Sequence, residues 1–554
     1  MAINLTKLTN AEYQLDGIRE AIDGDNAIKP SDPTAYYTAS GNPPGVWIGS
    51  AARLLGGTPG TTASSRTVRS LINERRDPAT GRYLGDTALA DGDSGRAPVA
   101  GFDLTTRQPK SVSILWAFSD ADTRRRIDQC MDRAAQMTID YFEHAVASTR
   151  TGQAGVASVA CDGVAGFVFD HYDSRDGDPQ PHKHIVISNR VRRSQDGVWT
   201  ALDGRKVYAS AVEISEYHEN LLQDLLTKEF GWAWTTRPAR GTQAVIQEVD
   251  GVPQELIDAF SGRHSQIQAK VDQRVRQEEQ QTGRKVGPRR RAQIDLEVWR
   301  ETRKAKPKIQ PSLDEKRRHW YDKLGRVAPG IQIDTMLRDV NARHDQPITV
   351  DAAGQEDAAR LLIAQLADRE QIRGGADAWL DMNAERATEA VGQTHTTWKA
   401  TNIRAESQRL LRTVRLDPTQ RLTACNAIAD ETTSRCVKLT PTRYRLPDGA
   451  AGDPTIALHD GRTVFDDPEL DKYTTQDILD AEQLMIDAFD RPQAGGYAPG
   501  AGKAWLTAWS RETERHGGHP PGGRPARRRR IRVGEPAAGR RDHRARRHRQ
   551  RPPP

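Results

Sequence analysis

The segment GVAGFVFDHYDSRDGDPQPHKHIVISNRV, residues 163–191, decides the fold. Its two apolar runs, FVF at 167–169 and IVI at 185–187, predict two β-strands, because β-branched and aromatic side chains favour strands. The residues between them, DSRDGDPQP, are typical of a turn. We therefore predict a β-hairpin.

Three histidines lie on this hairpin. A turn centred on residues 176–177 places His171 opposite His182, and a shift of the centre by one residue places it opposite His184. His182 and His184 are two residues apart and share a strand face, and cross-strand neighbours lie about 5 Å apart at Cβ. Either register predicts a three-histidine metal site.

The competing interpretation is a surface strand with solvated histidines, and Lys183 between the pair suits such a strand. The run IVIS at 185–188 is apolar on both faces, which favours a strand buried in a sheet. Because buried imidazoles need partners, we favour the metal site.

Length and composition indicate a soluble globular chain. The 554 residues predict two or more domains, and 36% are hydrophobic and 28% charged. The sequence has no run of 18 apolar residues, no apolar signal segment at its start, and four cysteines that fit a reducing compartment. We expect a cytoplasmic protein without membrane insertion.

The formal net charge of +6 comes from the last residues of the chain. Residues 521–554 contain 13 arginines and two acidic residues, and the rest of the chain has 68 basic and 73 acidic residues, a net charge of −5. Any surface that binds nucleic acid must therefore be a local patch.

The segment VAGFDLTTRQPKSVSILWAFSD predicts two further strands, at 102–105 and 112–116, with a basic turn that carries Arg107 and Lys110. Asp103 lies inside the first, apolar strand, so its carboxylate needs a hydrogen-bonded or charged partner. It either anchors a turn, or orients a histidine or accepts the proton of a tyrosine.

Helices are expected on both sides of the hairpin. Apolar residues recur at helical spacing over 120–146 and again over 212–230, where Gly231 provides a stop. Between the hairpin and the second helix, residues 197–208 predict a strand followed by a turn.

Tyr36 and Tyr37 form a pair ahead of a glycine- and proline-rich loop. A tyrosine pair usually serves packing, but tyrosine can also act as a covalent nucleophile. On a phosphodiester, a phosphotyrosyl link would conserve the energy of the cleaved bond for rejoining.

Four segments resemble a known family in their order and spacing: YYTASGNPPGVWIG, GFDLTTRQPKSVSILWAFSD, DHYDSRDGDPQPHKHIVISNRV and LDGRKVYASAVEISEYHENLLQDLLTKEFG. Residues 1–305 resemble the relaxase domain of the TrwC/TraI (MobF) class of conjugative relaxases, tyrosine-dependent nickases of the HUH endonuclease superfamily. The resemblance implies an α+β fold in which helices flank an antiparallel sheet. It also implies that this domain binds single-stranded DNA near the nick.

The resemblance also implies the residues of the site. His171, His182 and His184 would bind a divalent metal ion, either Mg, Mn or Zn. Asp103 falls on the aspartate of the family motif FDLT-x-x-x-PKSVS.

Two departures from the family pattern concern the site. Lys183 stands where the superfamily often has an apolar residue or threonine, but the pleat directs it to the face opposite the metal. Relatives commonly carry two tyrosine pairs, whereas this chain has Tyr36 and Tyr37, which fall on one pair, and the isolated Tyr13. We expect Tyr36 or Tyr37 to attack, with Tyr13 as the alternative.

The expected function is a metal-dependent, site- and strand-specific DNA transesterase. It would nick a transfer origin through a 5′-phosphotyrosyl intermediate, rejoin the strand and so initiate conjugative plasmid transfer. Expected partners are single-stranded DNA at the origin, accessory relaxosome proteins and a coupling protein. The alternatives are a rolling-circle replication initiator or transposase of the same superfamily, and a truncated, non-catalytic origin-binding protein.

Basic residues outside the hairpin are candidates for DNA contacts. Arg107 and Lys110 lie in the turn after Asp103, and Arg289, Arg290 and Arg291 lie in a charged helical tract at 264–305. This tract is either a solvated helix face or a basic arm that closes over single-stranded DNA.

The rest of the chain is less informative. Residues 306–515 predict a mainly helical region, and no G-x-x-x-x-G-K-[ST] motif predicts an ATPase or helicase. Residues 516–554 predict a disordered arginine-rich tail. Its abrupt composition favours a frameshift that removed a helicase, and a DNA-binding tail is the alternative.

Overall fold

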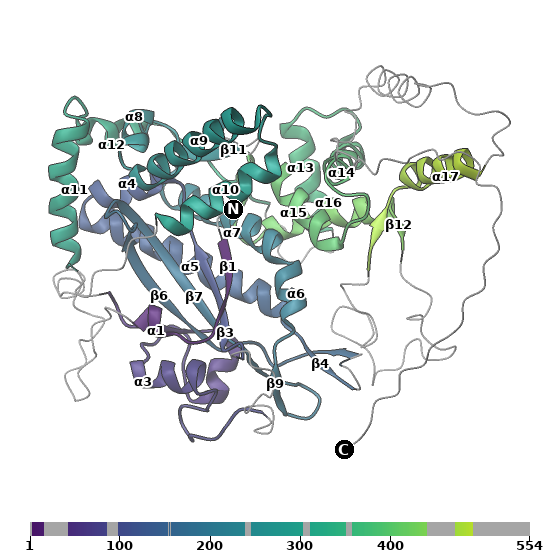
Figure 1. Cartoon of the computed structure of the whole chain (residues 1–554), viewed down its shortest axis with the longest axis horizontal. Coiled ribbons are helices and arrows are strands. Elements are labelled where there is room, and N and C mark those ends of the chain that lie inside the picture. Colours follow the sequence, from purple (N-terminus) through teal and green to yellow (C-terminus); the bar gives the residue numbers. More distant parts are fainter. Residues whose placement is uncertain are drawn as a thin grey trace, which may run out of the picture. The chain divides into compact units, whose positions relative to one another are not determined.

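Five antiparallel strands form the central sheet in the order β1-β3-β7-β6-β2 (Figure 1). These strands are β1 (Ile3–Leu8), β2 (Val46–Ile48), β3 (Gly101–Thr106), β6 (Gly166–Asp173) and β7 (Pro179–Ser188). The last six residues of β7 are all buried, as expected of a strand covered on both faces. The predicted hairpin of β6 and β7 and the predicted α+β fold are confirmed.

The computed structural model describes most of the chain. The described residues are 3–15, 42–85, 98–152, 155, 157–238, 245–302, 311–350, 357–439 and 471–490. Met1–Asp487 form one compact unit, and the second unit, Ala488–Pro554, lies almost wholly outside the described residues. The predicted disordered tail and the pair Tyr36 and Tyr37 also lie outside them.

Side chains of the sheet alternate between two covered faces. One face carries Phe102 and the isoleucines of β7, which pack against α5 (Ala121–Ala145) and α7 (Ala211–Phe230). The opposite face carries Val186 and the phenylalanines of β6, which pack against apolar side chains of residues 47–72. The histidines of the hairpin lie further along this second face.

The segment predicted as a strand at 112–116 is a helix instead, α4 (Lys110–Phe118). Every residue from Ser111 to Phe118 is buried, so the run has no polar face from which a helical period could be read. Glu248 accepts hydrogen bonds from the backbone N–H of Ser111 at 2.8 Å and from its hydroxyl at 2.6 Å. These bonds satisfy an amide of the first turn, which has no partner within the helix.

Residues 197–208 contain the predicted strand, β9 (Trp199–Ala201), but α6 (Gly204–Ala209) replaces the expected turn. Asp203 caps this helix, because its carboxylate accepts a hydrogen bond from the backbone N–H of Arg205 at 3.1 Å. This cap stabilises a short helix in a sequence whose composition is typical of a turn.

The helices predicted at 120–146 and 212–230 are present as α5 and α7, and α7 ends at Gly231, which has φ +71°. The remaining elements are α1 (Glu12–Leu15), η1 (Ser50–Leu55), α3 (Ser65–Val68), η2 (Arg69–Asn73), β4 (Thr149–Thr151), β5 (Ala157–Val159), β8 (Arg190–Arg192), β10 (Trp234–Pro238), β11 (Val245–Val249), α8 (Gln254–Ala259), α9 (Gly262–Thr282), α10 (Pro288–Glu301), α11 (Leu313–Val327), α12 (Ile333–Ala342), α13 (Ala358–Arg369), α14 (Gly375–Gly392), α15 (Ala400–Leu410), α16 (Arg421–Ser434), β12 (Val437–Lys438), β13 (Tyr473–Thr474) and α17 (Gln476–Asp490). Among the described residues, no helix combines the length and apolar character that a membrane span requires.

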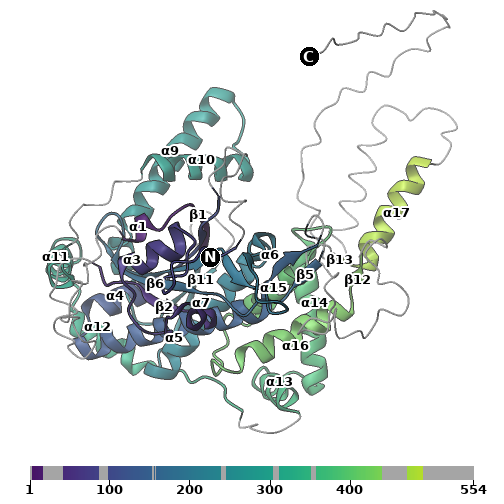
Figure 2. The ribbon, with the colours of Figure 1, turned by 90° about the horizontal axis from the view of Figure 1, so that it is seen from below.

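A network of ion pairs joins α7 to the helices beyond residue 357. Figure 2 shows the ribbons of α7 and α15 side by side. The acidic members, all on α7, are Glu213, Glu216 and Asp224, and their partners are Arg404, Arg409, Arg412, Arg415 and Arg421. Both side chains of the Asp224–Arg421 pair are fully buried, and Arg421 Nη2 lies 2.8 Å from Asp224 Oδ1. Since a buried charge needs its partner, these pairs hold α15 and α16 against α7.

We predict that Asp224→Ala lowers the free energy of unfolding by about 3–5 kcal/mol, because Arg421 is left buried without a counter-charge. Urea unfolding of the full chain measures the loss. The matched control is Asp377→Ala, which breaks an exposed pair with Arg360 and should cost less than about 1 kcal/mol. Equal effects of the two substitutions would contradict the prediction.

His218 of α7 gives the fold a dependence on pH. It is buried, and its Nδ1 lies 2.9 Å from the hydroxyl of Thr138. Burial, assisted by the positive charge of Lys183, lowers the pKa of His218 to about 4. The unfolded chain therefore binds this proton more tightly, so stability is full above about pH 6.5 and falls as the pH drops toward 4.

We predict that His218→Gln reduces the loss of stability between pH 6.5 and 4 by up to about 3 kcal/mol, the value of the pKa difference. Urea unfolding at a series of pH values measures this slope. His144→Gln, at an exposed histidine, should leave the slope unchanged, and an unchanged slope in His218→Gln would refute the assignment.

Candidate metal centre and nucleophile

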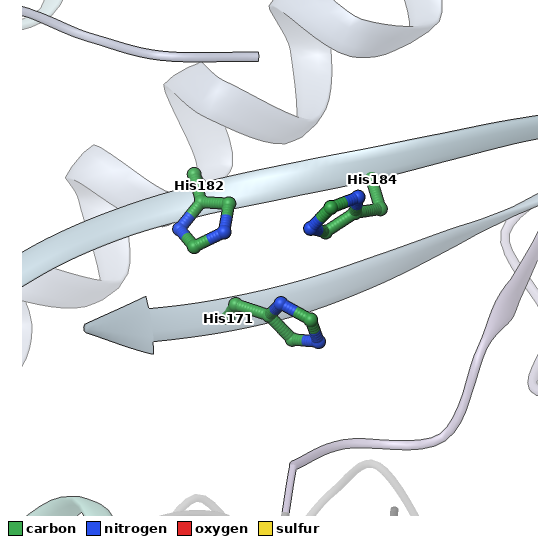
Figure 3. A group of neighbouring side chains, drawn as sticks. All are labelled: His171, His182 and His184. Atoms are coloured by element: carbon green, nitrogen blue, oxygen red, sulfur yellow. The ribbon is translucent and has the colours of Figure 1, made fainter. Parts of the chain in front are cut away.

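The three histidines of the β6–β7 hairpin converge on one point (Figure 3). His171 pairs directly with His182 across the strands, which is the first of the two predicted registers. The ring centroids of His171 and His184 are 4.7 Å apart, and each lies 5.2 Å from that of His182. One nitrogen from each ring lies within 4.8 Å of the others.

Backbone hydrogen bonds close the turn of the hairpin, and the pairing register shifts between His171 and Asp173, just before this turn. The backbone N–H of Gly177 donates to the carbonyl of Ser174 at 2.9 Å, and the N–H of Ser174 donates to the carbonyl of Asp178 at 2.8 Å. Gly177 has φ +80°, a conformation that side chains with a Cβ rarely adopt. A tight turn followed by a left-handed glycine is a common way to close a hairpin with a short loop.

One face of α11 holds the tip of the hairpin in place. Lys316 Nζ lies 2.7 Å from a carboxylate oxygen of Asp173, and the indole N–H of Trp320 donates to the carbonyl of Gly177 at 2.7 Å. Lys323, one turn further along the helix, pairs with Asp178. These helical residues lie beyond residue 305, so the elements that support the site extend past the predicted end of the relaxase domain.

Two of the histidines are oriented through their Nδ1 atoms. His182 Nδ1 lies 2.7 Å from the carbonyl oxygen of Gln180, and His184 Nδ1 lies 2.7 Å from Asp103 Oδ2. Because a carbonyl oxygen only accepts hydrogen bonds, Nδ1 of His182 carries the proton and its Nε2 is the nitrogen that could bind a metal ion. Acceptors of this kind are the usual partners of metal-binding histidines.

Asp103 is almost completely buried and is fully engaged. Besides His184, it accepts hydrogen bonds from the side-chain amide of Gln14 at 3.0 Å and from the hydroxyl of Thr105 at 3.2 Å. With these contacts Asp103 can orient the ring of His184, one of the two roles expected of it.

The donor set fits a divalent cation. Three neutral imidazoles suit Zn²⁺ and related transition metals, and they leave further coordination positions open for water or substrate. Within the described part of the chain, this is the one group of histidine, cysteine or carboxylate side chains close enough to share an ion.

Lys183 points to the opposite face, as the alternation of the strand predicts. Its Nζ lies 2.5 Å from Asp132 Oδ1 and 2.6 Å from Asp170 Oδ1. Burial opposes the charged form, but these two carboxylates outweigh it and raise the pKa of Lys183. The ammonium is thus neutralised behind the sheet and leaves the histidine face to the imidazoles.

Tyr13 lies beside the histidines. Its ring centroid is 5.9 Å from that of His184 and 6.4 Å from that of His171. Arg175, in the hairpin turn, donates a hydrogen bond to the Tyr13 hydroxyl at 3.0 Å, and its guanidinium lies 5.5 Å from the centre of the ring. The turn and the short helix α1 therefore bring a phenol to the edge of the metal centre.

Arg175 did not appear among the residues singled out from the sequence. The available signal was its place as the cation of the turn, within the same hairpin as the histidines. Its contact with Tyr13 spans 162 positions of the chain, so only the tertiary structure pairs the two residues.

The basic residues expected to bind DNA differ in their surroundings. Arg107 is exposed, whereas the ammonium of Lys110 donates to the carbonyl of Pro179 at 2.9 Å and burial lowers the pKa of Lys110 to about 8. Arg290 and Arg291 form ion pairs within the α9–α10 arm, and Arg289 is exposed. A role in DNA binding stays a prediction for all five.

A family model described as TrwC relaxase matches residues 9–327, more than half of the chain. The chain belongs to the TrwC relaxase family. The matched range includes Tyr13, Asp103, the three histidines and α11.

Two sequence relatives are named multifunctional conjugation protein TraI. One, from Escherichia coli, is 29% identical over 195 residues, which cover 33% of this chain and 10% of that protein. The other, from Escherichia coli strain K12, is 29% identical over 193 residues, with the same shares covered. The chain thus matches about a tenth of the length of these curated relatives.

Solved structures of the conjugative relaxase TrwC are similar to part of the chain. A metal-bound complex with oriT DNA is 21% identical, has a TM-score of 0.42, and covers 60% of this chain and 99% of its own. A complex with a 27-mer DNA that comprises the recognition hairpin and the cleavage site has the same identity, TM-score and coverage. The assignment to the family rests on the family model.

We predict that Asp103→Asn weakens metal binding by about 10- to 100-fold, the usual effect of removing the partner that orients a metal-binding histidine. Isothermal titration of the purified chain with Mn²⁺ or Zn²⁺ measures the affinity. Asp196→Asn, at an exposed carboxylate that pairs with Arg193, is the charge-matched control. The same affinity in Asp103→Asn and the control would exclude this role.

Proposed function

We propose that the chain is a metal-dependent relaxase that nicks and rejoins one DNA strand at a transfer origin, with Tyr13 as the nucleophile. The observation that carries the proposal is the Tyr13 hydroxyl, held by Arg175 beside three converging imidazoles. A phenol next to such a cluster is suited to attack a phosphodiester.

Each residue has a separate role in this proposal. His171, His182 and His184 would hold the cation, which would offset the negative charge that develops on the non-bridging oxygens of the phosphate. Asp103 would keep the ring of His184 in place. Its oxygens already accept bonds from three side chains, and this favours orientation over proton transfer.

The reaction would be a transesterification. The Tyr13 oxygen forms a bond to phosphorus, the bond from phosphorus to the 3′ oxygen breaks, and the phenolic proton ends on that oxygen, directly or through water. The products are a 5′-phosphotyrosyl link and a free 3′ hydroxyl. Attack by the hydroxyl reverses the step, and because the number of ester bonds is unchanged no ATP is needed.

Arg175 would position the nucleophile. Its guanidinium fixes the Tyr13 hydroxyl from one side through the hydrogen bond at 3.0 Å. A bound phosphate would bring negative charge next to the Tyr13 hydroxyl. The planar guanidinium of Arg175 could then donate hydrogen bonds to the phosphate and to the Tyr13 oxygen.

The biological setting is carried over from the relatives. Proteins named conjugation protein TraI and complexes of TrwC with oriT DNA support a single-stranded transfer origin as substrate and the start of plasmid transfer as the role. Accessory relaxosome proteins, a coupling protein and a cytoplasmic location are part of the same proposal. The exposed Arg107 and Arg289 would contact phosphates.

We predict that the wild-type chain forms a covalent adduct with labelled single-stranded oligonucleotides tiled across the DNA around its gene, in the presence of Mg²⁺ or Mn²⁺. Denaturing gels detect the adduct, and EDTA should abolish it. Tyr13→Phe should abolish it as well, whereas the double variant Tyr36→Phe/Tyr37→Phe is the matched control that retains it. If Tyr13→Phe keeps the adduct and the double variant loses it, the nucleophile is Tyr36 or Tyr37. If no adduct forms under any metal condition, the proposed catalytic activity is rejected.

A further inference from the structure

We propose that a cavity at the β1 edge of the sheet is a second binding site for single-stranded DNA, which takes one base and its adjoining phosphates. The cavity has a volume of about 570 Å³. Its described lining residues are Lys7, Gly204, Arg205, Tyr208, Ala209 and Lys399. The proposal rests on the proposed function, since it assigns a further contact to the same DNA strand.

Three separate parts of the chain build this cavity. Lys7 lies on β1, the edge strand of the sheet, and the glycine, arginine and tyrosine belong to α6. Lys399 is the N-cap residue of α15, in the helical region beyond residue 357. The elements β1, α6 and α15 lie close together in both views of the ribbon (Figures 1 and 2). The site therefore exists only when that region is docked on the sheet.

Tyr208 gives the cavity an aromatic platform. Its side chain is 41% exposed. Phe102 contacts it edge-to-face, with the ring centroids 6.2 Å apart, and Lys7 Nζ lies 5.0 Å from its centre. A ring that is held from behind and open in front suits the stacking of a base, which any nucleotide can provide.

The charge of the cavity favours a polyanion. Its described lining includes three cationic residues and no acidic one, whereas the chain without residues 521–554 has a net charge of −5. Arg205 donates two hydrogen bonds to the carboxylate of Asp203, each at 3.3 Å, and these bonds fix the direction of the guanidinium. A local cluster of cations around an aromatic side chain is the pattern of single-strand binding sites.

The cavity is close enough to the metal centre for one strand to reach both. Tyr13 lies six positions after Lys7, so their Cα atoms are at most about 20 Å apart. That distance corresponds to about six stacked nucleotides or fewer. Lys7 pairs with Phe102 and thus points away from the histidine face, but β1 is an edge strand, so DNA that leaves the metal centre can pass around this edge.

The test is binding of a fluorescein-labelled polythymidine oligonucleotide to the full chain, measured by fluorescence anisotropy over a range of salt concentrations. Tyr208→Ala should weaken binding by about five-fold or more, the effect of losing one stacked base. Tyr208→Phe should bind as the wild type does, because it keeps the ring. The double variant Lys7→Ala/Lys399→Ala should reduce the slope of log affinity against log salt by about 1.4, because each lost phosphate contact contributes about 0.7.

Arg373→Ala, at an exposed arginine between α13 and α14, is the control for a general loss of charge. Wild-type affinity and slope in both the tyrosine and the lysine variants would overturn the proposal, as would an effect of Arg373→Ala as large as theirs. This outcome is separate from that of the proposed function. If Tyr13→Phe shows no loss of adduct while Tyr208→Ala loses binding, the nucleophile assignment fails and the cavity stands.

Discussion

The register in which β6 pairs with β7 from Gly166 to His171 is the constraint on which the rest of the site depends. The two strands alternate their side chains, so a slip of β7 by one residue would turn His182 and His184 toward α5 and α7 and Lys183 toward the metal, away from His171 on β6. The left-handed Gly177 fixes the turn, and α11 holds the tip through Lys316, Trp320 and Lys323.

The same register is anchored on both faces of the sheet. The phenylalanines of β6 and Val186 enter one apolar cluster, and the isoleucines of β7 enter another. Lys183 finds two carboxylates behind the sheet, at distances of 2.5 and 2.6 Å. A slipped strand would lose the apolar packing in both clusters. It would also bury the ammonium of Lys183 without its carboxylate partners, and the free-energy penalty of a buried, unpaired charge is far larger than the gain from a polar contact at the surface.

The sequence was informative where one local pattern determines the structure. The hairpin, the shared face of the histidines and the need of Asp103 for a partner all follow from alternation and burial, and the structure places His171 opposite His182 in one of the two expected registers. Local patterns failed where tertiary packing decides. The run at 112–116 is buried on all sides and forms α4.

The relation between distant segments could not be read from the sequence either. Tyr13, the alternative to the expected pair, lies beside the histidines because Arg175 in the turn binds its hydroxyl. The ion pairs of Asp224 join α7 to helices almost 200 positions later. Both contacts join residues with no shared local pattern, so spacing along the chain carries no signal for them.

The measurement that most directly tests this account is anomalous X-ray scattering from crystals of the chain grown with Mn²⁺ or Zn²⁺. The account predicts one strong peak about 2.0–2.2 Å from a nitrogen of each of His171, His182 and His184, with the Tyr13 hydroxyl facing it. A peak bound elsewhere, or rings that turn away from a common centre, would contradict it.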